Sequence, residues 1–252
     1  MLADIFAILK TRGYATGVMS GASGPADADM AVLHVDATHT PEDYLRLAGR
    51  FPFCVNGMVA DISKSRVSDA ALTRDADWGG PVIVKTDLNS KGSPESKKNA
   101  RAARWRRPLP FPGTPPPRAY ETFPSLREVP DAIWDDPALV VERFLSERLP
   151  DGFGMCHYVF CGEYEFCARF VGTQELVKSQ NIFRHELIPV PPHIRNRRNE
   201  LGFDYGKFDF VLDGGEARLV DANKTPGRIP RSGGASLEGM ADGLLGLLRA
   251  RG

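Results

Sequence analysis

Near its end the chain reads Tyr205-Gly206-Lys207-Phe208-Asp209-Phe210-Val211-Leu212, then Asp213-Gly214-Gly215, then Glu216-Ala217-Arg218-Leu219-Val220-Asp221-Ala222-Asn223. An Asp-Gly pair between two alternating apolar runs predicts a β-hairpin. If the loop consists of Asp213 to Gly215, Leu212 pairs with Glu216 and Asp209 pairs with Leu219. One face of the hairpin then carries Lys207, Asp209, Leu219, Asp221 and Asn223.

The other face of this hairpin carries Phe208, Phe210, Val220 and Ala222, and we expect it to pack. Diagonal neighbours on paired strands lie roughly 7–8 Å apart at the backbone, so the carboxylates of Asp209 and Asp221 can converge on a hard cation such as Mg²⁺. A two-residue loop would instead put these two acids on opposite faces. Solvated acids near a turn are the alternative interpretation.

The segments around these acids resemble a known family. Asp221-Ala222-Asn223-Lys224-Thr225-Pro226-Gly227 resembles the acid-x-Asn-x-x-Pro-Gly metal-binding end of the ATP-grasp ligases. Gly206-Lys207-Phe208-Asp209 resembles the Gly-Arg-x-Asp run of the D-alanine ligase branch, with lysine in place of arginine. Where most members have glutamate before the metal-binding asparagine, this chain has Asp221, which is one methylene shorter.

Further segments resemble this family in the same order along the chain. Asp61-Ile62-Ser63-Lys64 resembles the start of a helix that carries a phosphate lysine, and Pro81-Val82-Ile83-Val84-Lys85 resembles the first ATP-grasp strand with its own phosphate lysine. Asp87-Leu88-Asn89-Ser90-Lys91-Gly92-Ser93 stands where the phosphate-covering loop belongs, with a single glycine. Leu139-Val140-Val141-Glu142-Arg143-Phe144-Leu145 resembles the hinge strand that receives adenine.

The resemblance implies an α+β ATP-grasp fold, in which two α+β subdomains enclose ATP, preceded by a small N-terminal α/β domain. We expect the N-terminal domain in residues 1–75, the first ATP-grasp subdomain in 76–137 and the second in 138–252. The N-terminal part agrees with this division, because residues 3–10 have helical apolar spacing and residues 31–35 read as a short buried strand.

The resemblance also implies the cofactors, ATP and Mg²⁺, and a role for each site residue. Lys85 and Lys207 could instead be ordinary strand lysines with apolar stems. Arg228 is preferred for binding a substrate carboxylate over Arg169, Arg184, Arg195 and Arg231. The expected metal ligands are Asp209, Asp221 and Asn223; the expected phosphate lysines are Lys64, Lys85 and Lys91; Lys207 is expected to stabilise an acyl phosphate; Glu142, Phe144 and Leu145 are expected at adenine and Glu147 at ribose.

Composition limits the partners of the chain. The 252 residues contain 32 Lys plus Arg and 32 Asp plus Glu, so no global field attracts nucleic acid or an acidic membrane. No apolar run is long enough to cross a bilayer and no secretory signal opens the chain, so a cytoplasmic location is expected. The four cysteines, Cys54, Cys156, Cys161 and Cys167, have no CxxC pair and are interpreted as buried thiols, with a zinc site that includes His157 as the alternative.

A basic stretch and a proline tract fill residues 91–117. Seven Lys or Arg stand between Lys91 and Arg107 against Glu95 alone, with Trp105 among them. The preferred interpretation is a solvated helix face followed by an extended proline-rich loop, with Lys91 closing over phosphates. RNA binding is the alternative, which the neutral total charge disfavours.

We therefore expect an ATP-dependent carboxylate-amine ligase that works through an acyl phosphate and releases ADP and phosphate. An amino acid or peptide is expected among its carboxylate and amine substrates. A small-molecule kinase on the same fold and a non-catalytic nucleotide-binding module are the alternatives. The sequence leaves the oligomeric state open, a homo-oligomer included.

Overall fold

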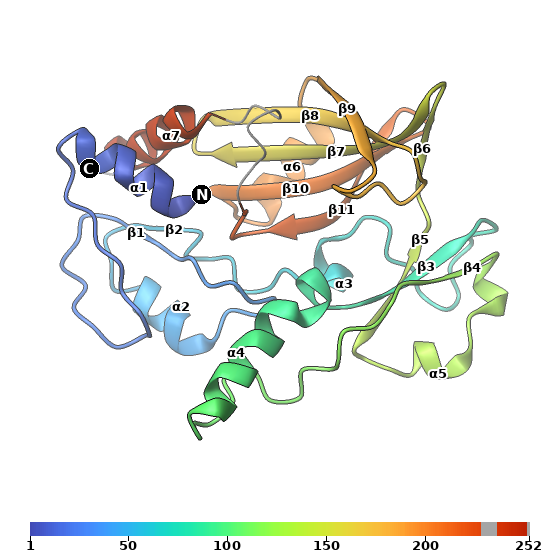
Figure 1. The fold of residues 1–252 in the computed structure, drawn as a ribbon, viewed down its shortest axis with the longest axis horizontal. Coiled ribbons are helices and arrows are strands. Elements are labelled where there is room, and N and C mark those ends of the chain that lie inside the picture. Colours follow the sequence, from blue (N-terminus) through green and yellow to red (C-terminus); the bar gives the residue numbers. More distant parts are fainter. Residues whose placement is uncertain (228–235, 251–252) are drawn as a thin grey trace.

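The computed structural model describes residues 1–227 and 236–250, which form two antiparallel sheets, a small parallel pair of strands and the helices around them (Figure 1). The largest sheet has the strand order β11-β10-β7-β8-β9, and β6 pairs with β7 beside this path. Its strands are β6 (Glu147–Leu149), β7 (Gly152–Cys161), β8 (Tyr164–Gly172), β9 (Ile182–Leu187), β10 (Tyr205–Asp213) and β11 (Glu216–Asn223).

Strand alternation divides the large sheet between two apolar cores. Val159 and Cys161 of β7 face helices α1 (Leu2–Thr11) and α7 (Leu237–Arg249). Tyr158 and Phe160 point to the other face, where α6 (Pro192–Glu200) and the segment around α3 (Lys64–Val67) pack. Because both faces are covered, β7 reads as a nearly continuous apolar run.

A close backbone approach fixes helix α7 on the large sheet. Gly243 lies so near β7 that a Cβ atom there would be 1.9 Å from the carbonyl oxygen of Cys161. Apolar residues at helical spacing, Met240 and Leu244, then reach the core shared with Ile5 and Leu9 of α1. Helices α1 and α7 lie side by side (Figure 1).

A three-stranded sheet with the order β4-β3-β5 forms the second layer. Val82 and Val84 of its central strand pack with Val129 and Ile133. The hinge strand β5 pairs with β3 over its whole length, so it belongs to the sheet of the expected first subdomain although it follows the expected boundary at residue 137. The elements of this layer are β3 (Val82–Thr86), β4 (Glu121–Phe123), β5 (Leu139–Arg143), the 3-10 helix η2 (Leu126–Glu128) and α5 (Asp131–Trp134).

The N-terminal part contains a small parallel pair of strands, β1 (Ala31–Val32) and β2 (Cys54–Val55), with α2 (Glu42–Ala48) between them in sequence. Helix α1 and strand β1 lie where the sequence predicted a helix, in residues 3–10, and a short strand, in residues 31–35. The predicted α+β class is confirmed. Among the described helices, none combines the length and the apolar character needed to cross a membrane.

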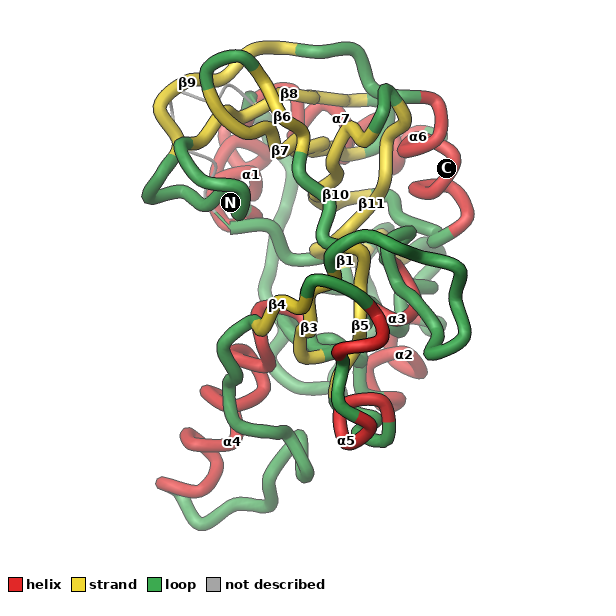
Figure 2. Tube along the Cα trace, turned by 90° about the vertical axis from the view of Figure 1, so that its right-hand side faces the viewer, coloured by secondary structure: helices red, strands yellow, loops and turns green. Residues whose placement is uncertain are grey.

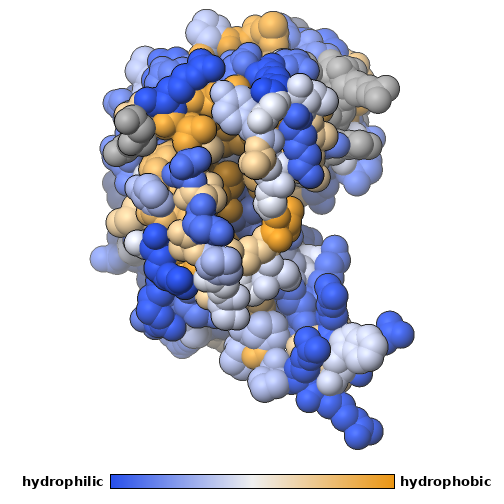
Figure 3. All heavy atoms as spheres, turned by 90° about the vertical axis from the view of Figure 1, so that its left-hand side faces the viewer, coloured by the Kyte–Doolittle hydropathy of each residue, from blue (hydrophilic) through white to orange (hydrophobic). Residues whose placement is uncertain are grey.

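The basic stretch forms helix α4 (Ser93–Arg104), which follows the one-turn 3-10 helix η1 (Asn89–Gly92). Figure 2 shows α4 projecting away from the body of the molecule, and the projecting part in Figure 3 is largely hydrophilic. The preferred interpretation of a solvated helix face followed by a loop is the one that the structure shows.

Candidate functional site

The predicted hairpin forms, but its turn is one residue shorter than expected. Asp213 pairs with Glu216, so the loop contains only Gly214 and Gly215, whose φ angles are +58° and +88°. Such positive angles are strained for other residues, which explains the Gly-Gly pair. Leu212 therefore pairs with Ala217, and the predicted pairing of Leu212 with Glu216 is wrong.

A two-residue turn by itself would put Asp209 and Asp221 on opposite faces of the hairpin. A β-bulge returns them to the same face. The register runs from Phe210 opposite Leu219 to Asp209 opposite Asp221, which leaves Val220 as an extra residue without a partner. Leu219 consequently joins the packed core with Phe210, and Val220 lies in a small separate cluster. The predicted faces of Leu219 and Val220 were wrong. Asp209 and Asp221 nevertheless share a face.

Asp209 forms an ion pair with a lysine on its own strand. Lys207 Nζ lies 2.8 Å from Oδ1 and 3.0 Å from Oδ2 of Asp209, and His157 Nε2 on the neighbouring strand β7 lies 3.6 Å from Oδ1. Burial opposes ionisation of Asp209, but Lys207 and His157 outweigh it and lower the pKa of the carboxyl. Oδ1 accepts no hydrogen bond of good geometry.

Asp221 forms a second ion pair, with the helix α3. Lys64 Nζ lies 3.0 Å from Asp221 Oδ1 and donates to the carbonyl oxygen of Leu88 at 3.2 Å. Burial disfavours the charged Lys64, but Asp221 outweighs this effect and raises the pKa of the ammonium. The carboxylate of Asp87 holds the first turn of α3 through the Ser65 N–H at 2.7 Å. Lys64 thus connects the hairpin with the segment after β3.

Tyr120 is surrounded by lysines from separate segments. Lys85 of β3 and Lys91 of η1 lie 5.8 Å and 4.3 Å from the centre of its ring, and Lys178 from the β8–β9 connection lies 6.0 Å away. Lys85 also forms a 2.5 Å ion pair with the fully buried Glu142 of β5. Sequence analysis missed Tyr120 and Lys178, because no local pattern marks either residue.

The segment after β3 turns sharply before helix α4. Ser90, Lys91 and Gly92 have φ angles of +48°, +59° and +73° in succession. The left-handed backbone conformation is strained for Ser90 and Lys91. Such a conformation persists only where neighbouring residues fix it. Asn89, which precedes the turn, is buried.

Asn223 lies beside the acids but is engaged within its own loop. Its Oδ1 accepts the N–H of Thr225 at 2.8 Å. The next residue, Lys224, is 1 % exposed and donates to Thr40 Oγ1 at 2.5 Å. Burial lowers the pKa of Lys224 to about 8. Sequence analysis missed this lysine, although a Lys inside the acid-x-Asn-x-x-Pro-Gly segment was visible.

Other predicted residues lie along the hinge. Glu147 forms a 2.9 Å ion pair with Arg169, and burial raises the pKa of its carboxyl against the effect of this arginine. The N–H groups of Phe144 and Leu145 donate to the carbonyl oxygens of Pro81 and Arg143. Residue Leu145 contacts the small cluster that holds Val220.

The arginine candidates for a substrate carboxylate are mostly engaged with acids of this chain. Arg169 pairs with Glu147 and Glu186, Arg184 with Asp151, and Arg195 with Glu165. Arg228, the preferred candidate, and Arg231 lie outside the described residues. Three of the cysteines, Cys156, Cys161 and Cys167, are buried as predicted, and Cys54 is partly buried.

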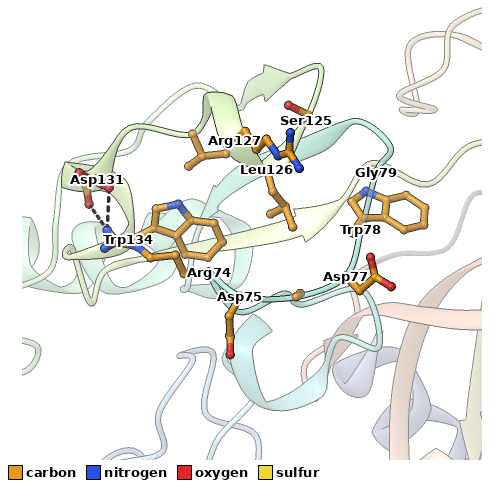
Figure 4. A pocket seen from close by; sticks show the side chains of 12 residues that line it. Arg74, Asp75, Asp77, Trp78, Gly79, Ser125, Leu126, Arg127, Asp131 and Trp134 are labelled. Atoms are coloured by element: carbon orange, nitrogen blue, oxygen red, sulfur yellow. Dashed lines mark hydrogen bonds and ion pairs between the residues drawn. The ribbon is translucent and has the colours of Figure 1, made fainter.

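A hollow of about 680 Å³ lies away from the paired acids (Figure 4). Trp78, Leu126 and Trp134 line it, and Arg74 pairs across it with Asp131 at 3.1 Å. Its lining includes none of the predicted site residues that the structure describes. A second groove of about 500 Å³ runs between Thr40, Leu88, Glu95 and residues 110–115.

No protein-family profile and no curated protein matches the chain. Among solved structures it is similar to the ATP-grasp ligase PsnB complexed with minimal precursor, at 12% identity and a TM-score of 0.40, over 67% of this chain and 48% of that one. It is similar to the D-alanine-D-alanine ligase from Bacillus anthracis, at 12% identity and a TM-score of 0.47, over 98% and 84%. A third similar structure is the VanG D-Ala:D-Ser ligase from Enterococcus faecalis, at 15% identity and a TM-score of 0.48, over 87% and 73%.

These similarities agree with the predicted ATP-grasp fold. The chain spans about half the length of PsnB. Identities and TM-scores this low do not bear on the activity, which we infer from the contacts of the chain itself.

Proposed function

We propose that the chain is an ATP-dependent carboxylate-amine ligase that binds Mg²⁺-ATP between the β10–β11 hairpin and the β4-β3-β5 sheet. The observation that carries this proposal is the direct pairing of Asp209 with Asp221, next to lysines contributed by other segments. Paired carboxylates bind a hard cation, and converging lysines bind a polyphosphate. Lys64 bonds to both Asp221 and the carbonyl oxygen of Leu88, so a lysine and a carboxylate lie side by side.

The described residues fit a magnesium ion in part. Asp209 and Asp221 supply two carboxylates on one face, and Oδ1 of Asp209 lies 2.8 Å from the Lys207 ammonium without a hydrogen bond of good geometry. Mg²⁺ in nucleotide sites takes one or two carboxylates, phosphate oxygens and water, so a two-acid set suffices. Within the described residues no cluster of three or more His, Cys, Asp or Glu has the arrangement of a metal site. Asn223 would have to release the Thr225 N–H to become a third ligand.

A bound magnesium ion would neutralise charge between the β- and γ-phosphates. Lys64, Lys85 and Lys91 would bind phosphate oxygens, and Lys178 joins this group because it also faces Tyr120. Lys85 now holds Glu142, and Lys64 holds Asp221. We infer that these lysines keep their ion pairs while their remaining N–H bonds turn to the nucleotide. The hinge residues Glu142, Phe144, Leu145 and Glu147 stay our proposal for the adenine and ribose contacts.

The reaction would proceed in two displacements. An oxygen of the substrate carboxylate attacks the γ-phosphorus and ADP leaves, which gives an acyl phosphate. The amine then attacks the acyl carbon, the carbon–oxygen bond to phosphate breaks, and the amine loses a proton. Lys207 would balance the charge of the acyl phosphate, and Arg228 would bind the substrate carboxylate. We propose an amino acid or a peptide as substrate, because this reaction joins a carboxylate to an amine.

Hydroxylamine trapping tests this function. The chain is incubated with Mg²⁺-ATP, hydroxylamine and a panel of amino acids and peptides, and hydroxamates are measured together with ADP. We expect one substrate class to give hydroxamate and ADP in equal amounts, because hydroxylamine captures the acyl phosphate. A phosphorylated product without hydroxamate would identify a small-molecule kinase instead. Nucleotide binding without turnover on any substrate would contradict the ligase.

A further inference from the structure

Five buried polar residues from four segments form a network beside the proposed phosphate site. We call them the Lys224 network; they are Thr38, Thr40, Asn89, Glu95 and Lys224, each no more than 7 % exposed. They come from the segment after β1, the start of η1, the first turn of α4 and the end of β11. Buried polar groups are costly unless they are hydrogen-bonded, so their contacts show what they stabilise.

The contacts of the network lead from Lys224 to the turn after β3. Lys224 Nζ donates to Thr40 Oγ1 at 2.5 Å and lies 3.5 Å from the carbonyl oxygen of Thr38. Thr38 in turn makes two further bonds. Its Oγ1 accepts the N–H of Asn89 at 2.9 Å, and its own N–H donates to Glu95 Oε1 at 2.5 Å.

These two bonds of Thr38 enclose the strained turn. Asn89 directly precedes Ser90, Lys91 and Gly92, the three residues with positive φ, and Glu95 lies three residues after them. Left-handed backbone at Ser90 and Lys91 requires neighbours that fix it. Thr38 bonds to the residues on both sides of this turn, and Lys224 bonds to the segment that contains Thr38.

We propose that Lys224 is a positioning residue that, through Thr38 and Thr40, holds the Ser90–Gly92 turn in place and thereby sets Lys91 relative to Asp221. Lys224 follows Asn223 on the strand that carries Asp221, so one residue joins the acid side of the site to the turn. An apolar residue of the same length would pack equally well but could not donate to a threonine oxygen. The role of Lys91 at phosphate rests on the proposed function; the hold on the turn does not.

Limited proteolysis tests the hold on the turn without any nucleotide. Lys224→Met keeps most of the apolar stem and removes the donor, so trypsin should cut after Lys91 about tenfold faster than in the wild-type protein. Thr38→Val removes the acceptor of the Asn89 N–H at nearly constant shape and should act in the same way. Lys224→Arg keeps a donor and should restore most of the protection.

Arg198→Met is the matched control. Arg198 is also a mostly buried cation, but it lies on helix α6 and bonds to Phe203, Gly162 and Tyr158. The loss of Arg198 should destabilise the protein. Cleavage after Lys91 should nevertheless stay at the wild-type rate when the variant and the wild-type protein are compared under conditions in which the same fraction of each is folded. If Lys224→Met does not fold, Thr38→Val decides. Wild-type cleavage in Lys224→Met and Thr38→Val, or equal acceleration in Arg198→Met, would overturn the proposal.

Nucleotide affinity separates this proposal from the proposed function. Binding of Mg²⁺ and a non-hydrolysable ATP analogue should weaken about tenfold in Lys224→Met, because Lys91 loses its position. If the wild-type protein binds no nucleotide, the ligase proposal fails while the proteolysis result still tests the turn. Faster cleavage with unchanged nucleotide affinity would overturn the link between Lys224 and Lys91.

Discussion

Three of the lysines expected at the site each lie against a carboxylate of this chain. Lys64 pairs with Asp221, Lys207 with Asp209 and Lys85 with Glu142. The sequence could predict the lysines from the strands and motifs that carry them, but not their partners. Glu142 is on β5, and its pairing with Lys85 depends on the register of two strands more than 50 residues apart.

The Lys85–Glu142 pair gives a prediction about stability. Lys85→Met should lower the free energy of unfolding by about 3–5 kcal/mol, because Glu142 would remain buried and charged without a partner. The double variant Lys85→Met/Glu142→Gln should recover most of this loss. Urea unfolding measures both variants. The double variant should nevertheless bind ATP poorly; full stability and full nucleotide affinity in Lys85→Met would show that Lys85 serves neither role.

Lys224 gives a prediction about pH. An unfolded lysine has a pKa of 10.5, and burial lowers that of Lys224 to about 8 in the fold. Between these values the unfolded chain holds a proton that the folded chain has lost, so stability rises with pH in this window. Relative to Lys224→Met, the wild-type protein should gain about 2 kcal/mol from pH 8 to pH 10. Urea unfolding of both proteins measures the difference in their free energies of unfolding. A difference that does not change with pH would contradict the lowered pKa of Lys224.

At the scale of elements, the hairpin was predictable and its geometry was not. The Asp-Gly signal marked the turn, but the turn has two residues where three were expected, and a bulge at Val220 compensates. No local sequence pattern predicts this bulge, because it results from tertiary packing. Leu219 packs in the large core, and Val220 packs in the cluster with Ala70 and Val211. The predicted shared face of Asp209 and Asp221 is therefore correct for a different reason.

Helix α4 illustrates a signal that was present in the sequence. The segment is rich in Ala, Lys and Arg, which favour helices, and Pro94 stands in its first turn. Asn99 on this helix binds the proline-rich loop, since its side chain donates to the Phe111 carbonyl oxygen at 2.6 Å and accepts the Phe111 N–H at 3.0 Å. The loop is therefore attached to the helix.

Removing this attachment should release the loop. Asn99→Ala should increase the rate of trypsin cleavage after Arg106 about tenfold, because Phe111 loses both hydrogen bonds. Mass spectrometry of the early fragments measures the sites. Lys97→Ala, on the same helix, is the control and should leave these rates unchanged. Similar rates in the wild-type protein and Asn99→Ala would mean that the loop is held elsewhere.

At the scale of the whole molecule, the proposed site lies between the β10–β11 hairpin and the β4-β3-β5 sheet. The hairpin acids were predicted from a local pattern, and the α+β class and the phosphate lysines from the family resemblance. The sequence could not predict Tyr120 or Lys178, because these residues approach Lys85 and Lys91 only through the tertiary fold. Nor could it predict that β5 would pair with β3, or that Thr38 would hold the turn before α4.

Calorimetric titration with a non-hydrolysable ATP analogue tests the central claim most directly, because it needs no knowledge of the substrate. The wild-type protein should bind the analogue with Mg²⁺ and lose most of this affinity when the metal is chelated. Asp209→Asn and Asp221→Asn should each weaken Mg²⁺-dependent binding at least about tenfold, since each removes an anionic ligand. Asp213→Asn, in the turn of the same hairpin, is the control and should bind normally; circular dichroism confirms that each variant is folded. Absence of binding in the wild-type protein, or wild-type affinity in both Asp209→Asn and Asp221→Asn, would contradict a magnesium-nucleotide site at the paired acids.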